Sequence, residues 1–349
     1  MSKIEFYQKE VKTWFLDPKD SFMEKELQFE LRKDFLTGHV SRILPFRRRK
    51  QSEHETPLEV LEASRKDCPF CPDKIFGLTP KFVSDFAPEG RIRRGKAVLF
   101  PNSFPYSRYN WVVVLSDEHV IPLDCISKEI LRDGFLVAQE GIEKVRLKEP
   151  ALQYCSINWN YFPQSGGGLF HPHIQVVIEG SPTSSHQKVL EGLRKYRKER
   201  GSFFWEDYLL EEIQIGKRYL GKQGKIHFLI AFSPRGVLGE IVVLFSERGL
   251  MSDLIMDDWE DLSQGLIKIF RFFKSQSIES FNLAIFSGND EGVPSWVYAR
   301  LCPRMYFPPW STSDINYFEK LHDEVICGVT PEELCKELQP FFHENKDLI

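Results

Sequence analysis

The sequence carries the same order of strand and helix signals twice, and this repetition constrains the fold more than any other feature. In the first copy, apolar β-branched runs at 96–100 and 111–115 precede an amphipathic stretch. In the second copy, runs at 225–229 and 240–244 do the same. Both copies then continue with a strand, a Gly/Ser loop and a last strand. Self-similarity of this kind predicts a tandem duplication.

The helix of each copy is expected where apolar side chains recur at helical spacing, at residues 128–148 and 259–275. The strand that follows each helix is expected to end at an asparagine. This residue is Asn158 or Asn160 in the first copy and Asn282 in the second.

The last strand of the first copy, residues 170–178, holds an unusual set of polar side chains. Because alternate side chains of a strand share a face, His171, His173 and Gln175 line one wall. Two histidines and an amide on one wall predict a catalytic site. A structural His-x-His pair and a second metal site are the alternatives.

A glycine loop precedes this strand. Glycine backbone can approach a phosphate closely, because no side chain intervenes and its N–H groups can point at the anion. We therefore expect the loop to bind substrate. It consists of Ser165, Gly166, Gly167 and Gly168.

Cys68 and Cys71 have the C-x-x-C spacing with which two thiolates hold one tetrahedral ion. A redox pair is the alternative, but that chemistry favours a strand-to-helix setting, whereas Pro72 follows here in a loop. His119, in a polar turn after a strand, and His171 could complete a closed Cys2His2 zinc site. Taken alone, His119 is more typical of a surface histidine than of a metal ligand.

If His171 binds zinc, its neighbour His173 is free to act as a nucleophile. A neutral imidazole is competent near pH 7, because its reference pKa is about 6.5. Attack on a nucleotide phosphorus would divide one phosphate-to-phosphate transfer into two displacements. Gln175 could donate its amide to the phosphate without competing as a nucleophile.

Composition excludes several classes of function. The 349 residues carry a net charge of −4, which argues against a nucleic-acid partner. Two basic stretches stand out, Arg47–Lys50 and a predicted helix over 187–200. No run approaches the ~20 apolar residues of a membrane span. Seven scattered cysteines do not suggest a disulfide framework, so we expect a soluble, cytoplasmic protein.

Taken together, the motifs resemble those of the histidine-triad (HIT) superfamily, and within it the galactose-1-phosphate uridylyltransferase branch. Their order matches that family over roughly residues 34–178. The matching motifs are Cys68-Pro69-Phe70-Cys71, Asn102-Ser103-Phe104, Ser116-Asp117-Glu118-His119, and Asn160 ahead of the glycine loop and His171-Pro172-His173-Ile174-Gln175.

The resemblance implies an α+β fold of tandem HIT-like repeats, each an antiparallel half-barrel sheet with flanking helices. Residues 1–200 would form the N-terminal catalytic repeat with the zinc site, and residues 201–349 a degenerate C-terminal repeat. The resemblance also implies a homodimer with sites built across the interface.

The resemblance further implies a nucleotidylyltransferase that moves a nucleoside monophosphate between a nucleotide sugar and a sugar 1-phosphate. His173 would be the nucleophile and Gln175 would contact the phosphate. One structural zinc ion would be held by Cys68, Cys71, His119 and His171. The nucleoside and its phosphates would be surrounded by Phe70, Asn102, Phe104, Asn160 and Arg47.

The chain departs from the family pattern at three places. Ser103 replaces an aspartate that can hold the ribose hydroxyls. Tyr298 and Arg300 replace a His-x-His pair, so we expect no second metal. The segment 314–319 lacks the usual sugar-phosphate signature, which leaves the acceptor open. A phosphorylase that uses inorganic phosphate, or a non-catalytic zinc-stabilised nucleotide-binding protein, are therefore alternatives.

Overall fold

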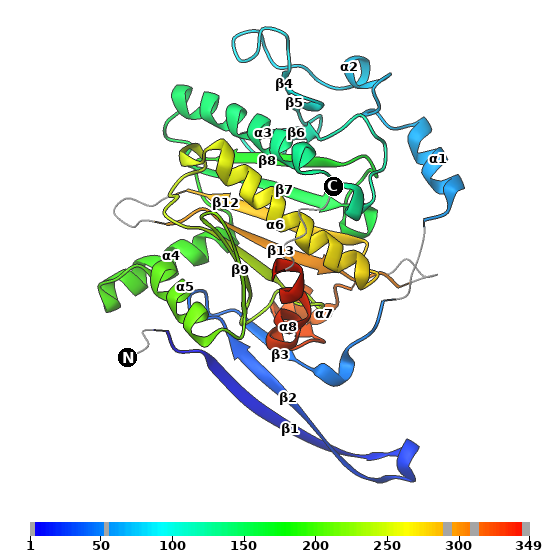
Figure 1. Ribbon diagram of the computed structural model, residues 1–349, viewed down its shortest axis with the longest axis vertical. Helices are drawn as coiled ribbons and strands as arrows, with labels where there is room; N and C mark the ends of the chain where they lie inside the picture. Colours follow the sequence, from blue (N-terminus) through cyan, green and yellow to red (C-terminus); the bar gives the residue numbers. More distant parts are fainter. Residues whose placement is uncertain (1–3, 52–55, 289–294, 308–313, 344–349) are drawn as a thin grey trace.

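The computed structural model describes residues 4–51, 56–288, 295–307 and 314–343 (Figure 1). At its centre is a ten-stranded antiparallel sheet with the order β4-β5-β6-β8-β7-β12-β13-β11-β10-β9. Its strands are β4 (Ile92–Arg94), β5 (Ala97–Pro101), β6 (Tyr109–Val114), β7 (Tyr154–Tyr161), β8 (His173–Glu179), β9 (Tyr219–Gln223), β10 (Ile226–Ile230), β11 (Ile241–Phe245), β12 (Ser280–Ser287) and β13 (Tyr298–Arg304).

The strand order confirms the tandem repeat. Reading outward from the central pair β7–β12, one half has the order β7, β8, β6, β5, β4 and the other β12, β13, β11, β10, β9. The two halves therefore share one topology, in which the first three strands are neighbours in chain order and the last two strands are exchanged. The two repeats join edge to edge, where β7 and β12 pair antiparallel from Phe281–Tyr161 to Ser287–Cys155.

One predicted strand boundary is wrong. Asn282 lies near the start of β12, where it pairs with Asn160, and not at the end of a strand. The reason is that alternation of buried side chains continues beyond it through Leu283 and Ile285. Of the loop expected to follow, Asn289 and Asp290 lie outside the described residues.

Two long helices cover one face of the sheet: α3 (Lys128–Lys148), whose bounds match the prediction, and α6 (Met256–Ser275). The side chain of Ser127 caps α3 by accepting a hydrogen bond from the Ile130 N–H. The helices pack on the main hydrophobic core, which runs beneath both repeats. Their aromatic side chains meet where Phe135 stacks on Trp259, with ring centroids 5.1 Å apart.

The opposite face of the sheet differs between the repeats. In the second repeat it is covered by α4 (Ser184–Arg200) and α5 (Phe204–Ile215), which pack on a second apolar cluster. In the first repeat the same face carries only a small cluster around Phe70 and Phe100. The first repeat thus keeps a polar strand face available for chemistry.

A second, four-stranded sheet has the order β1-β2-β3-β14. Its long hairpin projects from the body of the molecule (Figure 1). This hairpin was not predicted from the sequence: Leu27, Phe29 and Leu31 alternate with polar residues in β2, but in β1 the consecutive apolar residues 14–16 interrupt the alternation. The strands are β1 (Tyr7–Asp17), β2 (Met23–Lys33), β3 (Val40–Ile43) and β14 (Val325–Cys327).

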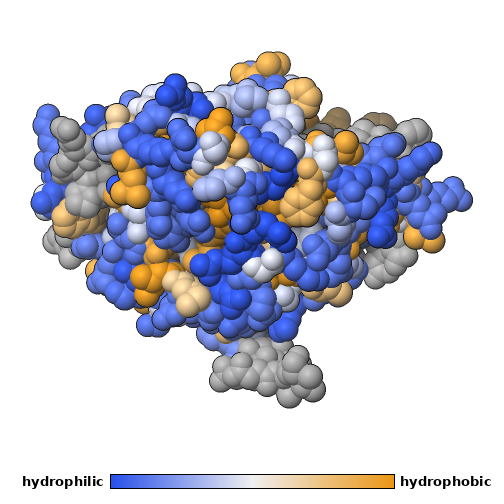
Figure 2. Space-filling view, turned by 90° about the horizontal axis from the view of Figure 1, so that it is seen from above, coloured by the Kyte–Doolittle hydropathy of each residue, from blue (hydrophilic) through white to orange (hydrophobic). Residues whose placement is uncertain are grey.

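The remaining helices are α1 (Leu58–Lys66), α2 (Ile75–Leu78), α7 (Tyr317–His322) and α8 (Pro331–His343). Within the described ranges, every helix is too short or too polar to cross a bilayer. The face shown in Figure 2 is mostly hydrophilic, with apolar residues in small separate groups.

Candidate active site and metal centre

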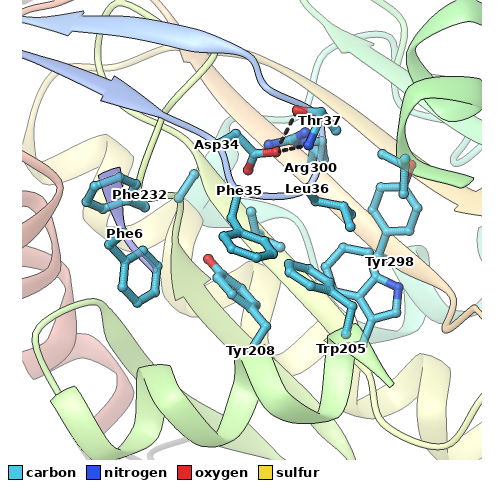
Figure 3. A pocket seen from close by; sticks show the side chains of 14 residues that line it. Phe6, Asp34, Phe35, Leu36, Thr37, Trp205, Tyr208, Phe232, Tyr298 and Arg300 are labelled. Atoms are coloured by element: carbon cyan, nitrogen blue, oxygen red, sulfur yellow. Dashed lines mark hydrogen bonds between the residues drawn. The ribbon is translucent and has the colours of Figure 1, made fainter. Parts of the chain in front are cut away.

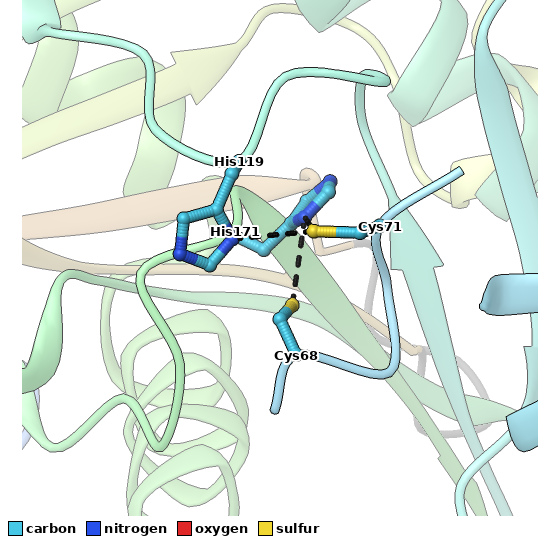
Figure 4. A group of neighbouring side chains, drawn as sticks. All are labelled: Cys68, Cys71, His119 and His171. Carbon is cyan, nitrogen blue, oxygen red and sulfur yellow. Dashed lines mark hydrogen bonds between the residues drawn. The ribbon is translucent and has the colours of Figure 1, made fainter. Parts of the chain in front are cut away.

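Two cysteines and two histidines from distant parts of the chain meet beside β8 (Figure 4). Cys68 and Cys71 lie in the loop between α1 and α2, His119 follows β6, and His171 precedes β8. All four side chains are buried, and one ligand atom from each lies within 4.8 Å of the others. The closest approach is 3.5 Å, between Cys71 Sγ and His119 Nδ1.

Neighbouring groups fix which nitrogen of each histidine faces the sulfurs. The Ser64 hydroxyl donates to the Leu61 carbonyl at 2.7 Å, so it accepts from His119 Nε2–H at 2.8 Å. His171 Nε2–H donates to the Ser116 carbonyl at 2.8 Å. In both rings Nδ1 therefore keeps its lone pair and points toward the cysteines. Metal-binding histidines are oriented in this way by a second hydrogen bond.

Burial sets the protonation of the cluster. It lowers the pKa of His171 to about 4 and also lowers the pKa of His119, so both imidazoles are neutral at pH 7. Burial raises the pKa of Cys68 to about 11. A cation is the group that would stabilise the thiolate here. Two sulfurs and two oriented Nδ1 atoms therefore fit a tetrahedral metal ion.

His173, the first residue of β8, is buried beside this cluster. Its Nδ1–H donates to the His171 carbonyl at 2.8 Å, which leaves the lone pair on Nε2. The Phe70 ring lies against it, with centroids 5.2 Å apart. Burial lowers the pKa of His173, so the neutral, nucleophilic form predominates at pH 7.

Gln175 lies two residues further along β8 and is half-buried. Its side-chain carbonyl accepts from the Tyr106 hydroxyl at 2.9 Å and from Asn102 Nδ2 at 3.5 Å. With its oxygen occupied, the amide NH2 is the part left to contact a ligand. The sequence analysis missed Tyr106. The only signal for it is its position two residues after Phe104 in an expected site loop.

The loop of Asn102 and Phe104 is ordered by its own hydrogen bonds. Asn102 Oδ1 accepts from the Phe104 N–H at 3.0 Å, and Asn102 Nδ2 donates to Asn110 Oδ1 at 2.8 Å. Asn102 thus acts as a turn residue within the chain. The Phe104 side chain is 85% exposed, so it is free to cover a ligand.

The glycine loop follows β7. The buried Ser165 hydroxyl donates to the Tyr161 carbonyl at 2.9 Å, which commits it to the loop itself. Gly166 has a φ of 90°, a conformation that L side chains rarely adopt. A Cβ on Gly167 would lie 3.0 Å from the Phe162 carbonyl, whereas Gly168 faces open space. The loop therefore favours glycine at positions 166 and 167.

Asn160 is exposed at the end of β7 and faces the second repeat. Its Oδ1 accepts from Asn282 Nδ2 at 2.6 Å, and that amide also donates to the Ser165 carbonyl at 2.9 Å. Arg304 donates to Asn282 at 2.7 Å and pairs with Asp314 at 2.6 Å. The glycine loop is thus tied to the second repeat.

Arg47 lies apart from these residues. It is exposed and lines a groove of about 750 Å³ together with residues of α6 and α8. None of the lining residues of this groove belongs to β7 or β8. The structure therefore does not bring Arg47 to the His173 wall of its own chain.

In the second repeat, Tyr298 and Arg300 lie on β13, the counterpart of β8. Both line an enclosed pocket whose walls are aromatic, including Phe35, Trp205 and Tyr208 (Figure 3). Arg300 pairs with the fully buried Glu240 at 2.5 Å. This face is packed with apolar side chains and buried ion pairs.

Comparison with known proteins places the chain in a family. It is 30% identical over 316 residues to an uncharacterized protein of Archaeoglobus fulgidus, covering 90% of this chain and 93% of that protein. No protein-family model matches the chain. Three solved structures at 18% identity share its fold. The first is a galT-like protein from Arabidopsis thaliana, with a TM-score of 0.68 over 88% of this chain and 98% of that one. The second is an ADP-glucose phosphorylase from Arabidopsis thaliana with bound ADP-glucose, with a TM-score of 0.67 over 88% of this chain and 98% of that one. The third is a uridylyltransferase, with a TM-score of 0.65 over 90% of this chain and 98% of that one.

The chain therefore belongs to the same family as the Archaeoglobus protein. Its fold is the one seen in the galT-like protein and in the uridylyltransferase, which agrees with the fold that the sequence motifs imply. The fold class of the sequence analysis is thereby confirmed. At 18% identity, the solved structures establish the fold of this chain but not its function.

Proposed function

We propose that this protein is a nucleotidylyltransferase that works through a covalent nucleotidyl intermediate on His173. The observation that carries the proposal is the hydrogen bond from His173 Nδ1–H to the His171 carbonyl, 2.8 Å long. It leaves Nε2 as the unprotonated nitrogen. The names of the structural neighbours, a uridylyltransferase and an ADP-glucose phosphorylase, agree with this class of reaction.

In the first step, His173 Nε2 attacks the α-phosphorus of a nucleoside-diphosphate sugar. A nitrogen–phosphorus bond forms, and the bond from the α-phosphorus to the bridging oxygen breaks, which releases a sugar 1-phosphate. In the second step, a phosphate oxygen of the acceptor attacks the same phosphorus and frees the histidine. Gln175 donates its amide N–H to the phosphate oxygens, where negative charge accumulates. The Tyr106 hydroxyl holds that amide in place.

The metal in this proposal is a single structural zinc ion on Cys68, Cys71, His119 and His171. Two sulfur and two imidazole ligands suit zinc and leave no open position for water. When bound, the ion would stabilise the thiolates and fix the loop on which His171 lies. Because His171 supplies the carbonyl that orients His173, the metal would position the nucleophile without entering the reaction.

We also propose that the protein acts as a homodimer in the cytoplasm. Arg47 does not line the wall of its own chain, so a phosphate contact by this residue would be made in the site of a partner copy. Sedimentation velocity should then show a dimer. An active monomer would contradict the proposed homodimer and the contact of Arg47 with a partner copy.

Product analysis tests the function. UDP-glucose and ADP-glucose are each incubated with the protein and with galactose 1-phosphate, inorganic phosphate or neither, and products are identified by liquid chromatography and mass spectrometry. We expect a new nucleotide sugar with the sugar phosphate. A nucleoside diphosphate formed only with inorganic phosphate would instead assign a phosphorylase. His173→Asn is the control that should form neither product.

Nucleotide binding with no product from any donor would contradict the proposal and favour the non-catalytic alternative. Equal turnover by the wild type and the His173→Asn variant would also contradict it, because the nucleophile would then be another residue.

A further inference from the structure

The long β1–β2 hairpin has a free edge. β1 is the outermost strand of the four-stranded sheet, and within the described part of the chain only β2 pairs with it. The hairpin projects from the body (Figure 1), and the side chains of β1 are exposed from Tyr7 to Leu16 apart from the half-buried Val11. β1 contains no proline, and its register with β2 continues without a bulge along the whole strand. Natural proteins commonly interrupt a long edge in these ways, because its unpaired N–H and C=O groups recruit another strand.

One face of the hairpin is apolar. Residues directly opposite each other in a strand pair lie on the same face, so the odd-numbered residues of β1 and β2 share one face. On this face Val11 lies opposite Phe29, with Phe15, Leu27 and Leu31 nearby. The even-numbered face is largely polar. A two-stranded ribbon is marginally stable by itself, and further strands stabilise it.

The charges of β1 include a carboxylate that lacks a cation. Glu10 forms no ion pair within the described ranges, and the residue opposite it on β2 is Glu30. Like charges directly opposite each other destabilise a strand pair. Lys12 pairs with Glu26 at 2.9 Å, and since both side chains are exposed, its ammonium keeps donors for a second carboxylate. A strand added to the free edge can therefore offset the charge of Glu10.

We propose that β1 pairs antiparallel with β1 of a second copy of this chain, about a two-fold axis at Val11. In this register, Glu10 of each copy faces Lys12 of the other, so the symmetry forms the ion pair twice. Tyr7 of each copy likewise faces Phe15 of the other. Odd-numbered residues remain opposite odd-numbered ones, so the apolar faces of the two hairpins join into one face of four strands.

Other registers and the other edge of the sheet fit less well. A two-fold axis at Glu10 or at Lys12 places that charge opposite itself. An axis at Thr13 places Glu10 opposite Leu16, which leaves the carboxylate without a cation. The other edge strand, β14, is three residues long, so it can pair with only a small part of β1. A second copy of β1 agrees in both length and charge.

This contact is separate from the one proposed for Arg47. None of the residues that line the groove at Arg47 belongs to β1 or β2. The pairing of the hairpins therefore requires neither the proposed reaction nor the dimer proposed with it, and the failure of either would leave the following tests unchanged.

A disulfide cross-link in the full-length protein tests the register. Val11→Cys should give a covalent dimer under mild oxidation, because directly opposite Cα atoms are about 4.5–5.5 Å apart, within reach of a disulfide. Lys9→Cys is the matched control on the same face. Because Lys9 faces Thr13 of the other copy, its two thiols would be about 13 Å apart and should not cross-link. The wild type controls for the native cysteines, of which Cys125 is exposed.

Charge reversal tests the ion pairs, with association measured by sedimentation. Glu10→Lys should weaken association by roughly tenfold or more, because the symmetry creates two like-charge contacts. Glu10→Lys/Lys12→Glu should recover most of it, because opposite charges then face each other again. Glu24→Lys makes the same change at an exposed residue of β2, away from the edge, and should associate as the wild type does.

Three results would each overturn the proposal. They are the absence of a covalent dimer in Val11→Cys, equal cross-linking of Val11→Cys and Lys9→Cys, and no recovery of association in a folded Glu10→Lys/Lys12→Glu variant. If that double variant does not fold, the comparison of Val11→Cys with Lys9→Cys decides, because it leaves the charges at Glu10 and Lys12 unchanged.

Discussion

The two repeats present the same face of one sheet to different surroundings. In the first repeat, β8 carries His173 and Gln175 on that face, and only a small cluster around Phe70 packs nearby. In the second repeat, the counterpart strand β13 carries Tyr298 and Arg300 beneath α4 and α5. One face keeps unpaired polar atoms, and the other is filled by apolar packing and ion pairs.

The two repeats also differ in the polar groups that connect their elements. The first repeat uses the Cys2His2 cluster, whose residues come from three separate loops. The second uses a buried network in which Glu332 of α8 bonds Arg32 and Arg218, each at 2.9 Å. The two repeats thus share one scaffold and differ in the side chains that it presents, and the following variants test whether chemistry belongs to the first repeat alone.

The largest effect is expected at the proposed nucleophile. His173→Asn should lower the exchange rate by roughly 10⁴-fold or more, because the proposed covalent intermediate forms on this residue. Exchange of labelled sugar phosphate into the nucleotide sugar is the measurement. Tyr298→Phe, on the counterpart strand, should leave the rate near that of the wild type. Comparable losses in both variants would show that the second repeat takes part in the chemistry.

Loss of the metal ligand Cys68 should be the next largest effect. A structural zinc site contributes on the order of 10 kcal/mol of apparent binding free energy, so Cys68→Ala should lose the metal and unfold at a clearly lower temperature. Metal analysis and calorimetry are the readouts. Cys125→Ala changes an exposed free cysteine and should alter neither quantity. Full zinc content in Cys68→Ala would rule out the proposed ligand set.

Glu332→Ala should destabilise the protein without removing metal. It removes the carboxylate that Arg32 and Arg218 share, and because Arg32 keeps Glu30 and Arg218 keeps Glu212, the expected cost is about 1.5–3 kcal/mol. Glu337→Ala, on the same helix, breaks a more exposed pair with Arg48 and should cost about 1 kcal/mol or less. Denaturant unfolding measures both. Equal costs would mean that the network does not stabilise the second repeat.

Tyr106→Phe should have the smallest effect. Removing one neutral hydrogen bond to Gln175 costs about 1 kcal/mol, so kcat/KM should fall roughly fivefold while the fold is unchanged. If the tyrosine positions the amide for the transition state, kcat should fall more than KM rises. Tyr7→Phe, at a tyrosine that is 56% exposed on β1, serves as the control. An unchanged kcat would leave Tyr106 without a positioning role.

Much of this architecture could be predicted from the sequence, because periodicity and repetition are local signals. The bounds of α3 agree with the prediction, and the repeat in the sequence appears as a repeat in strand order. The long β1–β2 hairpin was not predicted, because only β2 alternates apolar and polar residues, at Leu27, Phe29 and Leu31, whereas β1 has three consecutive apolar residues that break the pattern. The packing of α4 and α5 on the second repeat could not be predicted either, because it depends on tertiary contacts that the spacing of residues along the chain does not encode.

For the site, sequence motifs pointed to the wall of His173 and Gln175 and to four residues that the fold brings together as a cluster. They could not reveal the hydrogen bonds that set the tautomers of His119 and His171. One partner, Ser64, is distant in sequence, and the other is a backbone carbonyl, that of Ser116, which every residue type provides. The roles of the site residues, and the division of the chain at residue 200, remain predictions.

The measurement that tests the central claim most directly is the mass of the intact protein after incubation with UDP-glucose or ADP-glucose, followed by peptide mapping. The account predicts a gain of one nucleoside monophosphate that is labile to acid and maps to His173 in the first repeat. It predicts no gain in the His173→Asn variant. An adduct on any residue of the second repeat, or no adduct in metal-replete protein that turns over substrate, would contradict it.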